Sequence, residues 1–151
     1  MNNRLRPQSI SFEFSQPLDR GGMMLGELLV DGRPLREHVE RAWKNPVDSI
    51  SPLGWTTDEF ALHHVERLLL RREPELISGR RELLVCPQCA DLGCGCISVK
   101  VEEQGDFYVW SDFGYENDYE EDSLCLIKMS KMVFRKTDLL HLFRSVVPGL
   151  D

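Results

Sequence analysis

Long apolar runs are missing from this chain, and their absence limits where the protein works. No uninterrupted apolar stretch approaches the roughly 20 residues that a membrane-spanning helix needs. Residues 1–8 carry Arg4 and Arg6, but the apolar run of a signal peptide does not follow them. The sequence therefore predicts a cytoplasmic protein without a membrane partner.

Lysine and arginine are absent from residues 101–127, although nine acidic residues lie there. Residues 1–81 hold 12 basic and 12 acidic side chains, so the net charge of −7 originates later in the chain. A concentrated negative field repels nucleic acid and attracts basic partners. The nine acids are Glu102, Glu103, Asp106, Asp112, Glu116, Asp118, Glu120, Glu121 and Asp122.

Local catalytic signatures are also lacking. The chain contains no G-x-S-x-G elbow, no phosphate-binding Walker loop, no dinucleotide-binding glycine pattern and no H-E-x-x-H metal motif. These absences favour a non-catalytic binding protein over an enzyme.

Apolar periodicity predicts one α+β domain over residues 1–151. A connection rich in Pro, Asp and Gly is expected over 15–22. Helices are expected from Pro34, from a Thr56–Glu59 capping box and from a Thr137 cap. Strands are predicted over 9–14, 23–30, 82–86, 96–103, 107–111, 124–127 and 132–135. Because the strands follow one another without helical crossovers in the second half, we expect an antiparallel sheet of about five to six strands. About three helices should pack on one side of it.

Four of the five cysteines lie within eleven residues, in the pattern C-x2-C-x4-C-x-C. Without a secretory signal, reduced thiols or metal ligands are better interpretations than disulfides. A C-P-x-C turn can direct two thiolates to one side, and zinc takes four such ligands in a tetrahedron. One hypothesis is therefore a structural zinc at Cys86, Cys89, Cys94 and, as a fourth ligand, Cys96.

Other interpretations of these cysteines stay open. Three of them could share a metal with His63, His64 or His141. Alternatively, the thiols fill buried space at the end of a hairpin and the protein has no cofactor. A thiol oxidoreductase using Cys86 and Cys89 is a further hypothesis, because C-x-x-C pairs carry out such chemistry.

The cysteine motif also carries a resemblance. Cys86-Pro-Gln-Cys-Ala-Asp-Leu-Gly-Cys-Gly95, followed by Trp110-Ser-Asp-Phe-Gly-Tyr115, resembles a segment of a group of uncharacterised bacterial proteins of similar size. The match covers residues 86–115. It implies a bacterial origin and no particular activity.

The segment from Trp110 to Asp122 interleaves aromatic and acidic residues. Aromatic side chains anchor protein interfaces, and carboxylates steer basic partners. The pattern is typical of a small acidic inhibitor, so we expect an immunity protein that neutralises a basic toxin or nuclease. The expected contact residues are Trp110, Asp112, Phe113, Tyr115, Glu116, Asp118, Tyr119, Glu120, Glu121 and Asp122.

Two alternatives apply to the same segment. Its acids could form a solvated loop that protects a sheet edge from aggregation. Its acids at Asp112, Glu116, Asp118 and Glu120 could instead hold a divalent cation, although the spacing differs from an EF-hand loop.

Overall fold

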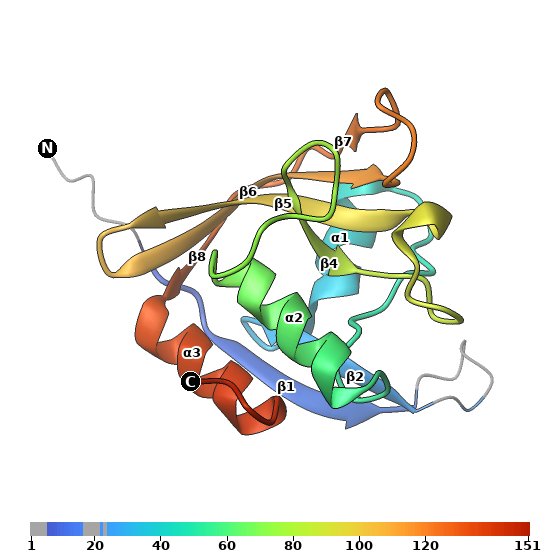
Figure 1. The fold of residues 1–151 in the computed structure, drawn as a ribbon. Helices are drawn as coiled ribbons and strands as arrows, with labels where there is room; N and C mark the ends of the chain where they lie inside the picture. The colour runs from blue at the N-terminus through green and yellow to red at the C-terminus, as the bar shows by residue number, and fades with distance from the viewer. Residues whose placement is uncertain (1–5, 17–21, 23) are drawn as a thin grey trace, which may run out of the picture.

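The first strands form a small antiparallel sheet. The computed structural model describes residues 6–16, 22 and 24–151 (Figure 1). Strands β1 (Ile10–Ser15), β2 (Leu25–Val30) and β3 (Arg33–Pro34) pair in that order. Most of the predicted connection after Ser15, and Met23 of the predicted second strand, lie outside the described residues.

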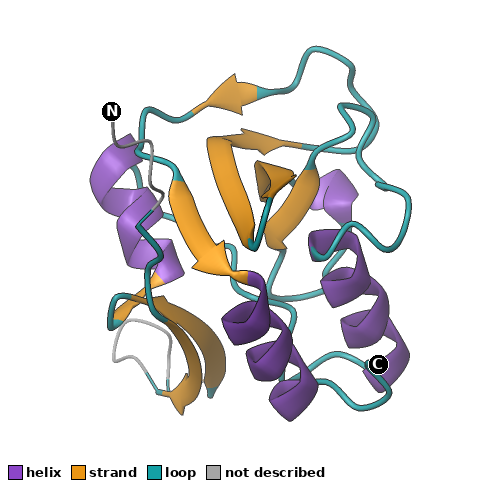
Figure 2. Cartoon of the chain, turned by 90° about the vertical axis from the view of Figure 1, so that its left-hand side faces the viewer, coloured by secondary structure: helices purple, strands orange, loops and turns teal. Residues whose placement is uncertain are grey.

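The remaining strands form a second antiparallel sheet around one long strand. Strands β4 (Arg81–Leu84), β5 (Cys96–Gln104) and β6 (Phe107–Glu116) are consecutive neighbours. One half of β6 pairs with β7 (Cys125–Leu126), and the other half pairs with β8 (Met132–Arg135). In both views the smaller sheet lies below this larger one (Figures 1 and 2). The α+β class with antiparallel pairing is confirmed, with the strands divided between two sheets.

Three helices cover these sheets in the described part of the chain. Helix α1 (Leu35–Trp43) packs against β2 and β3, and α2 (Asp58–Leu68) packs against β4. Helix α3 (Lys136–Val146) contacts β1 and β8, so it ties the two sheets together. Helices α2 and α3 lie below the larger sheet in Figure 1. No helix among the described residues has the length and apolar character to cross a membrane.

Two predicted helix caps are wrong. The hydroxyl of Thr57, rather than Thr56, accepts the N–H of Phe60 at 3.1 Å and caps α2. Thr56 instead donates to the carbonyl of Pro52 at 2.7 Å. Helix α3 begins directly after β8 without a side-chain cap, which places Thr137 inside its first turn. The capping pattern alone cannot tell which of two adjacent threonines caps a helix. It also cannot show that a helix begins directly after a strand without a cap.

The core joins both sheets and all three helices in one cluster of buried side chains. Trp110 of β6 meets Phe134 of β8 with ring centroids 4.6 Å apart. Strand β6 continues to Glu116, whereas the predicted strand ended at Ser111. Asp112, with φ of 51°, lies where the β5–β6 register shifts. The first half of the acidic aromatic segment is therefore part of the sheet.

Candidate metal centre

The cysteine loop connects β4 to β5 and is held at both ends. Val85 forms a bridge with Ile50, through backbone hydrogen bonds of 2.7 and 2.9 Å, immediately before Cys86. The N–H of Ala90 then donates to the carbonyl of Cys86 at 2.9 Å and closes a tight turn. Asp91 accepts the N–H of Gly93 at 2.8 Å and starts a short 3-10 turn over Leu92–Cys94. These turns bring the first three cysteines of the motif close together.

Their sulfur atoms converge. The Sγ atoms of Cys86, Cys89 and Cys94 all lie within 4.8 Å of one another, and those of Cys89 and Cys94 are 3.5 Å apart. A tetrahedral zinc with Zn–S bonds near 2.3 Å holds its sulfurs about 3.8 Å apart. The three thiols are therefore spaced as zinc ligands are, and small side-chain rotations would complete the geometry.

The electrostatics of the loop differ from one thiol to the next. The backbone N–H groups of Gln88 and Cys89 lower the pKa of the Cys86 thiol. Hydrogen bonds with the sulfurs of Cys89 and then Cys86 raise the pKa of Cys94 to about 11. A metal ion must displace a proton from each thiol that it binds. Cys86 therefore gives up its proton to a metal more readily than an ordinary thiol does, and Cys94 less readily.

Cys96 does not join the other three, which corrects the predicted ligand set. It is fully buried and packs in a separate apolar cluster with Leu76, Ala90 and Leu92. Gly95, with φ of 95°, turns the chain between the loop and β5, where Cys96 pairs with Glu116. Burial raises the pKa of this thiol, with the nearby Glu116 and Glu82 carboxylates adding to the effect. Cys96 belongs to the core.

Histidines do not complete the cluster. In the part of the chain that the structure describes, the three cysteines are the single group of metal-binding side chains close enough to share an ion. This excludes His63, His64 and His141 as additional ligands in this conformation. His64 is instead buried, with its Nδ1 atom 3.7 Å from Oε2 of Glu82.

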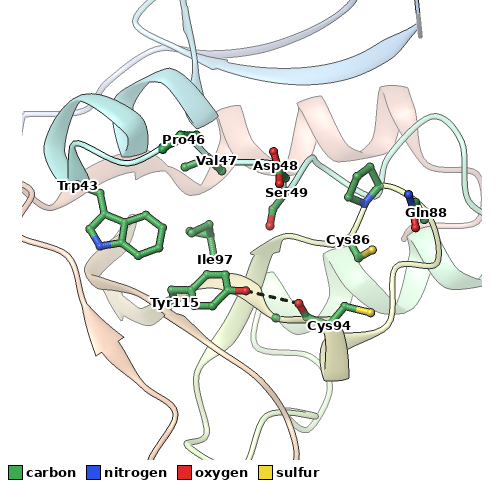
Figure 3. A pocket seen from close by; sticks show the side chains of 12 residues that line it. Trp43, Pro46, Val47, Asp48, Ser49, Cys86, Gln88, Cys94, Ile97 and Tyr115 are labelled. Carbon is green, nitrogen blue, oxygen red and sulfur yellow. Dashed lines mark hydrogen bonds between the residues drawn. The ribbon is translucent and has the colours of Figure 1, made fainter. Parts of the chain in front are cut away.

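A pocket of about 520 Å³ opens beside the cysteine loop. Cys86 and Cys94 line one end, Trp43 lies at the other, and Tyr115, whose ring stacks on Trp43, lies between them (Figure 3). The centroids of the two rings are 5.5 Å apart, with the planes inclined by 28°. The hydroxyl of Tyr115 donates to the carbonyl of Cys94 at 3.5 Å. Cys86 and Cys94 therefore belong both to the cysteine cluster and to the lining of the pocket.

Several predicted partner-binding residues lie inside the protein, and this corrects the predicted contact surface. Trp110, Phe113 and Glu116 are buried, so a docking protein cannot reach them. Glu116 forms an ion pair with Nε of Arg80 at 3.0 Å and accepts hydrogen bonds from Ser78 and Ser98. The side chain of Arg80 also donates to the carbonyl of Asp112. Glu116 is a structural residue.

The second half of the segment remains accessible. Asn117 accepts the N–H groups of Tyr119 and Glu120 through its side-chain oxygen, at 3.2 and 2.9 Å, and shapes a turn after β6. Tyr119 is 66% exposed, and Leu126 on the neighbouring edge strand β7 is 61% exposed. Asp112, Glu120, Glu121 and Asp122 are also exposed, and Asp118 is partly buried. Among the described residues, these acids do not converge as a cation site would require.

The pocket was not predicted from the sequence. Trp43, Ser49 and Ile97 come from separate segments of the chain, and no local pattern joins them. Tyr115 was predicted to contact a partner, whereas the structure places it, partly buried, against Gly95 and Trp43. No protein-family model matches the chain, and neither a curated protein nor a solved structure shows significant similarity to it.

Proposed function

We propose that this is a zinc-binding protein in which Cys86, Cys89 and Cys94 hold one ion. The supporting observation is the convergence of three sulfur atoms within 4.8 Å on a loop fixed by backbone hydrogen bonds. Thiolates are soft ligands, which select zinc and related thiophilic metals over magnesium or calcium. The ion would join the C-P-x-C turn to the following 3-10 turn and stabilise the loop.

The first test is metal content. Purified protein should contain about one zinc per chain, because three thiolates and one further donor satisfy tetrahedral coordination. In a competition with a chromophoric chelator, Cys89→Ser should weaken zinc affinity at least tenfold, since it removes one of three protein ligands. Cys125→Ser is the matched control, because Cys125 is an exposed thiol on β7 outside the cluster.

Equal zinc binding by wild type and a Cys86/Cys89/Cys94 triple serine variant would contradict the proposal. Circular dichroism of each variant separates loss of ligands from loss of fold. The alternative that these thiols fill buried space is wrong for Cys89 and Cys94, which are exposed, and it describes Cys96, which is buried.

We infer a second function, binding of a basic protein, from the exposed part of the acidic segment. Exposed Tyr119 is flanked by Asp118, Glu120 and Glu121, and Leu126 lies exposed on the adjacent edge strand. An accessible aromatic anchor surrounded by carboxylates suits a partner rich in lysine and arginine. A basic nuclease or toxin would be such a partner, and the chain would then act as its immunity protein. We call residues 117–122 the acidic loop.

Neutralising the acidic loop should weaken capture of a basic partner. The variant Asp118→Ser/Glu120→Ser/Glu121→Ser should retain less partner in pull-downs, with the largest deficit at low salt, where charges are least screened. Its control is Glu102→Ser/Glu103→Ser/Asp106→Ser, which removes the same charge from the β5–β6 hairpin. Equal retention of a partner by both variants would contradict a specific role for the acidic loop.

A further inference from the structure

The number of protein ligands at the candidate metal centre leaves one coordination position open. Structural zinc sites are normally closed by four protein ligands, whereas three protein ligands and an open position characterise sites where water or substrate binds. Among the described residues, no fourth histidine, cysteine or carboxylate lies close enough to Cys86, Cys89 and Cys94. An ion on these three thiolates would therefore take its fourth ligand from outside the described part of the chain.

The pocket lies where such a ligand can reach the ion. Cys86 and Cys94, two of the three ligands, belong to its lining, and Figure 3 shows their sulfur atoms on the side of the pocket where Gln88 lies. An ion that they share would lie at that end. Its volume of about 520 Å³ falls within the range of small-molecule sites. Figure 3 shows the side chain of Ser49 directed toward the space between Cys86 and Ile97. A molecule in this space would contact both the metal and the protein wall.

The side chains that line the pocket indicate the chemical character of the part of the ligand that does not bind the metal. From Cys94 the wall continues through Tyr115 to Trp43, whose ring stacks on it, with the fully buried Ile97 beside them. Such a surface favours a flat or apolar group. The buried Ser49 hydroxyl adds one hydrogen-bonding group. A metal at one end and an aromatic wall that begins beside it suit a molecule that carries a donor atom on a short apolar body.

We propose that this pocket binds a small organic thiol with an aromatic or apolar body, whose sulfur becomes the fourth ligand of the ion. The inference rests on the proposed zinc function. A site that already holds three thiolates suits a fourth soft donor, and metal coordination deprotonates a thiol, so the ligand binds as its thiolate. The sulfur donates an electron pair to the metal, and its proton leaves to solvent. Trp43 and Tyr115 would select the apolar body.

The experiment uses cobalt(II)-loaded full-length protein, because thiolate-to-cobalt charge transfer reports each sulfur ligand. Benzyl mercaptan is the probe, and benzyl alcohol is the control that keeps the ring but lacks the sulfur. We expect the mercaptan to increase the charge-transfer absorbance saturably and to quench tryptophan fluorescence, with neither effect from the alcohol. The variant Ser49→Leu, which fills the pocket, should weaken mercaptan binding at least tenfold and leave cobalt stoichiometry unchanged. Trp43→Leu should weaken it without weakening 2-mercaptoethanol, which has no ring.

The failures of the two ideas are distinguishable. A protein that binds one cobalt ion but shows no spectral response to saturating mercaptan overturns the thiol site and leaves the zinc function standing. A protein that binds no cobalt overturns both. Equal mercaptan affinity in wild type and Ser49→Leu, with normal cobalt binding in each, places the thiol outside this pocket and also overturns the proposal.

Discussion

Replacing Glu116 by alanine should lower the free energy of unfolding by about 3–5 kcal/mol, because it leaves the buried guanidinium of Arg80 without its carboxylate partner. Glu116 is 3% exposed and forms an ion pair with Arg80, which is itself buried. The carboxylate also accepts hydrogen bonds from Ser78 and Ser98, so its removal leaves several buried donors with fewer acceptors. Urea unfolding followed by circular dichroism measures the difference, and thermal unfolding should shift downward by about 10 °C.

The matched control comes from the same acidic segment. Glu121 is exposed, so Glu121→Ala should leave the unfolding midpoint unchanged. Replacing both members of the pair, as Arg80→Met/Glu116→Met, should cost less than Glu116→Ala alone, because no buried charge is then left unpaired. Equal midpoints for wild type and Glu116→Ala would contradict the structural role of this carboxylate and return it to the candidate contact surface.

The second large expected effect is a loss of stability at acidic pH, when Glu82 becomes protonated. This carboxyl is 1% exposed, and its Oε2 atom lies 2.6 Å from a terminal nitrogen of Arg67. Burial acts to raise the pKa of Glu82, but the adjacent His64 ring and the Arg67 guanidinium outweigh it and lower the pKa to about 2. Because a lowered pKa means that the folded state binds fewer protons, this group stabilises the protein at pH above the unfolded value near 4.5.

The contribution of Glu82 should disappear as pH falls from about 4.5 to about 2, at a total cost of about 3 kcal/mol. Urea midpoints measured between pH 7 and pH 2.5 should therefore decline more steeply for wild type than for Glu82→Gln, which cannot titrate. The glutamine variant should already be less stable at pH 7, since the charge of Arg67 loses its closest partner. Glu75→Gln is the control, because Glu75 is an exposed second partner of Arg67. Parallel declines in wild type and Glu82→Gln would contradict the lowered pKa.

Local sequence patterns predict much of the fold. Alternation of Ile10, Phe12 and Phe14 predicted β1, and the glycine turn at Gly105 predicted the β5–β6 hairpin. The division into two sheets was not predicted, because alternation identifies the buried face of a strand but not its neighbour. The full length of β6 was also missed. Its second half carries Asp112 and Glu116, residue types that are depleted in strands, although Trp110, Phe113 and Tyr115 in the same stretch favour a strand.

The candidate metal centre was predictable only in part. The C-P-x-C turn correctly predicted that Cys86 and Cys89 lie together, and the short spacing brought Cys94 to them. Cys96 was wrongly included among the predicted ligands. The residue pattern does not specify the conformation of Gly95, which turns the next residue into the core. The pocket could not be predicted at all, since Trp43 and Ser49 meet the cysteine loop only through tertiary packing.

The close packing of Tyr115 over Gly95 has a consequence for how this protein can vary between species. A Cβ atom built on Gly95 would clash with the phenolic oxygen of Tyr115. A side chain at position 95 therefore demands the loss or displacement of the ring at position 115, and with it one wall of the pocket. We therefore expect positions 95 and 115 to change together, and a paired substitution would mark a relative whose pocket has a different shape.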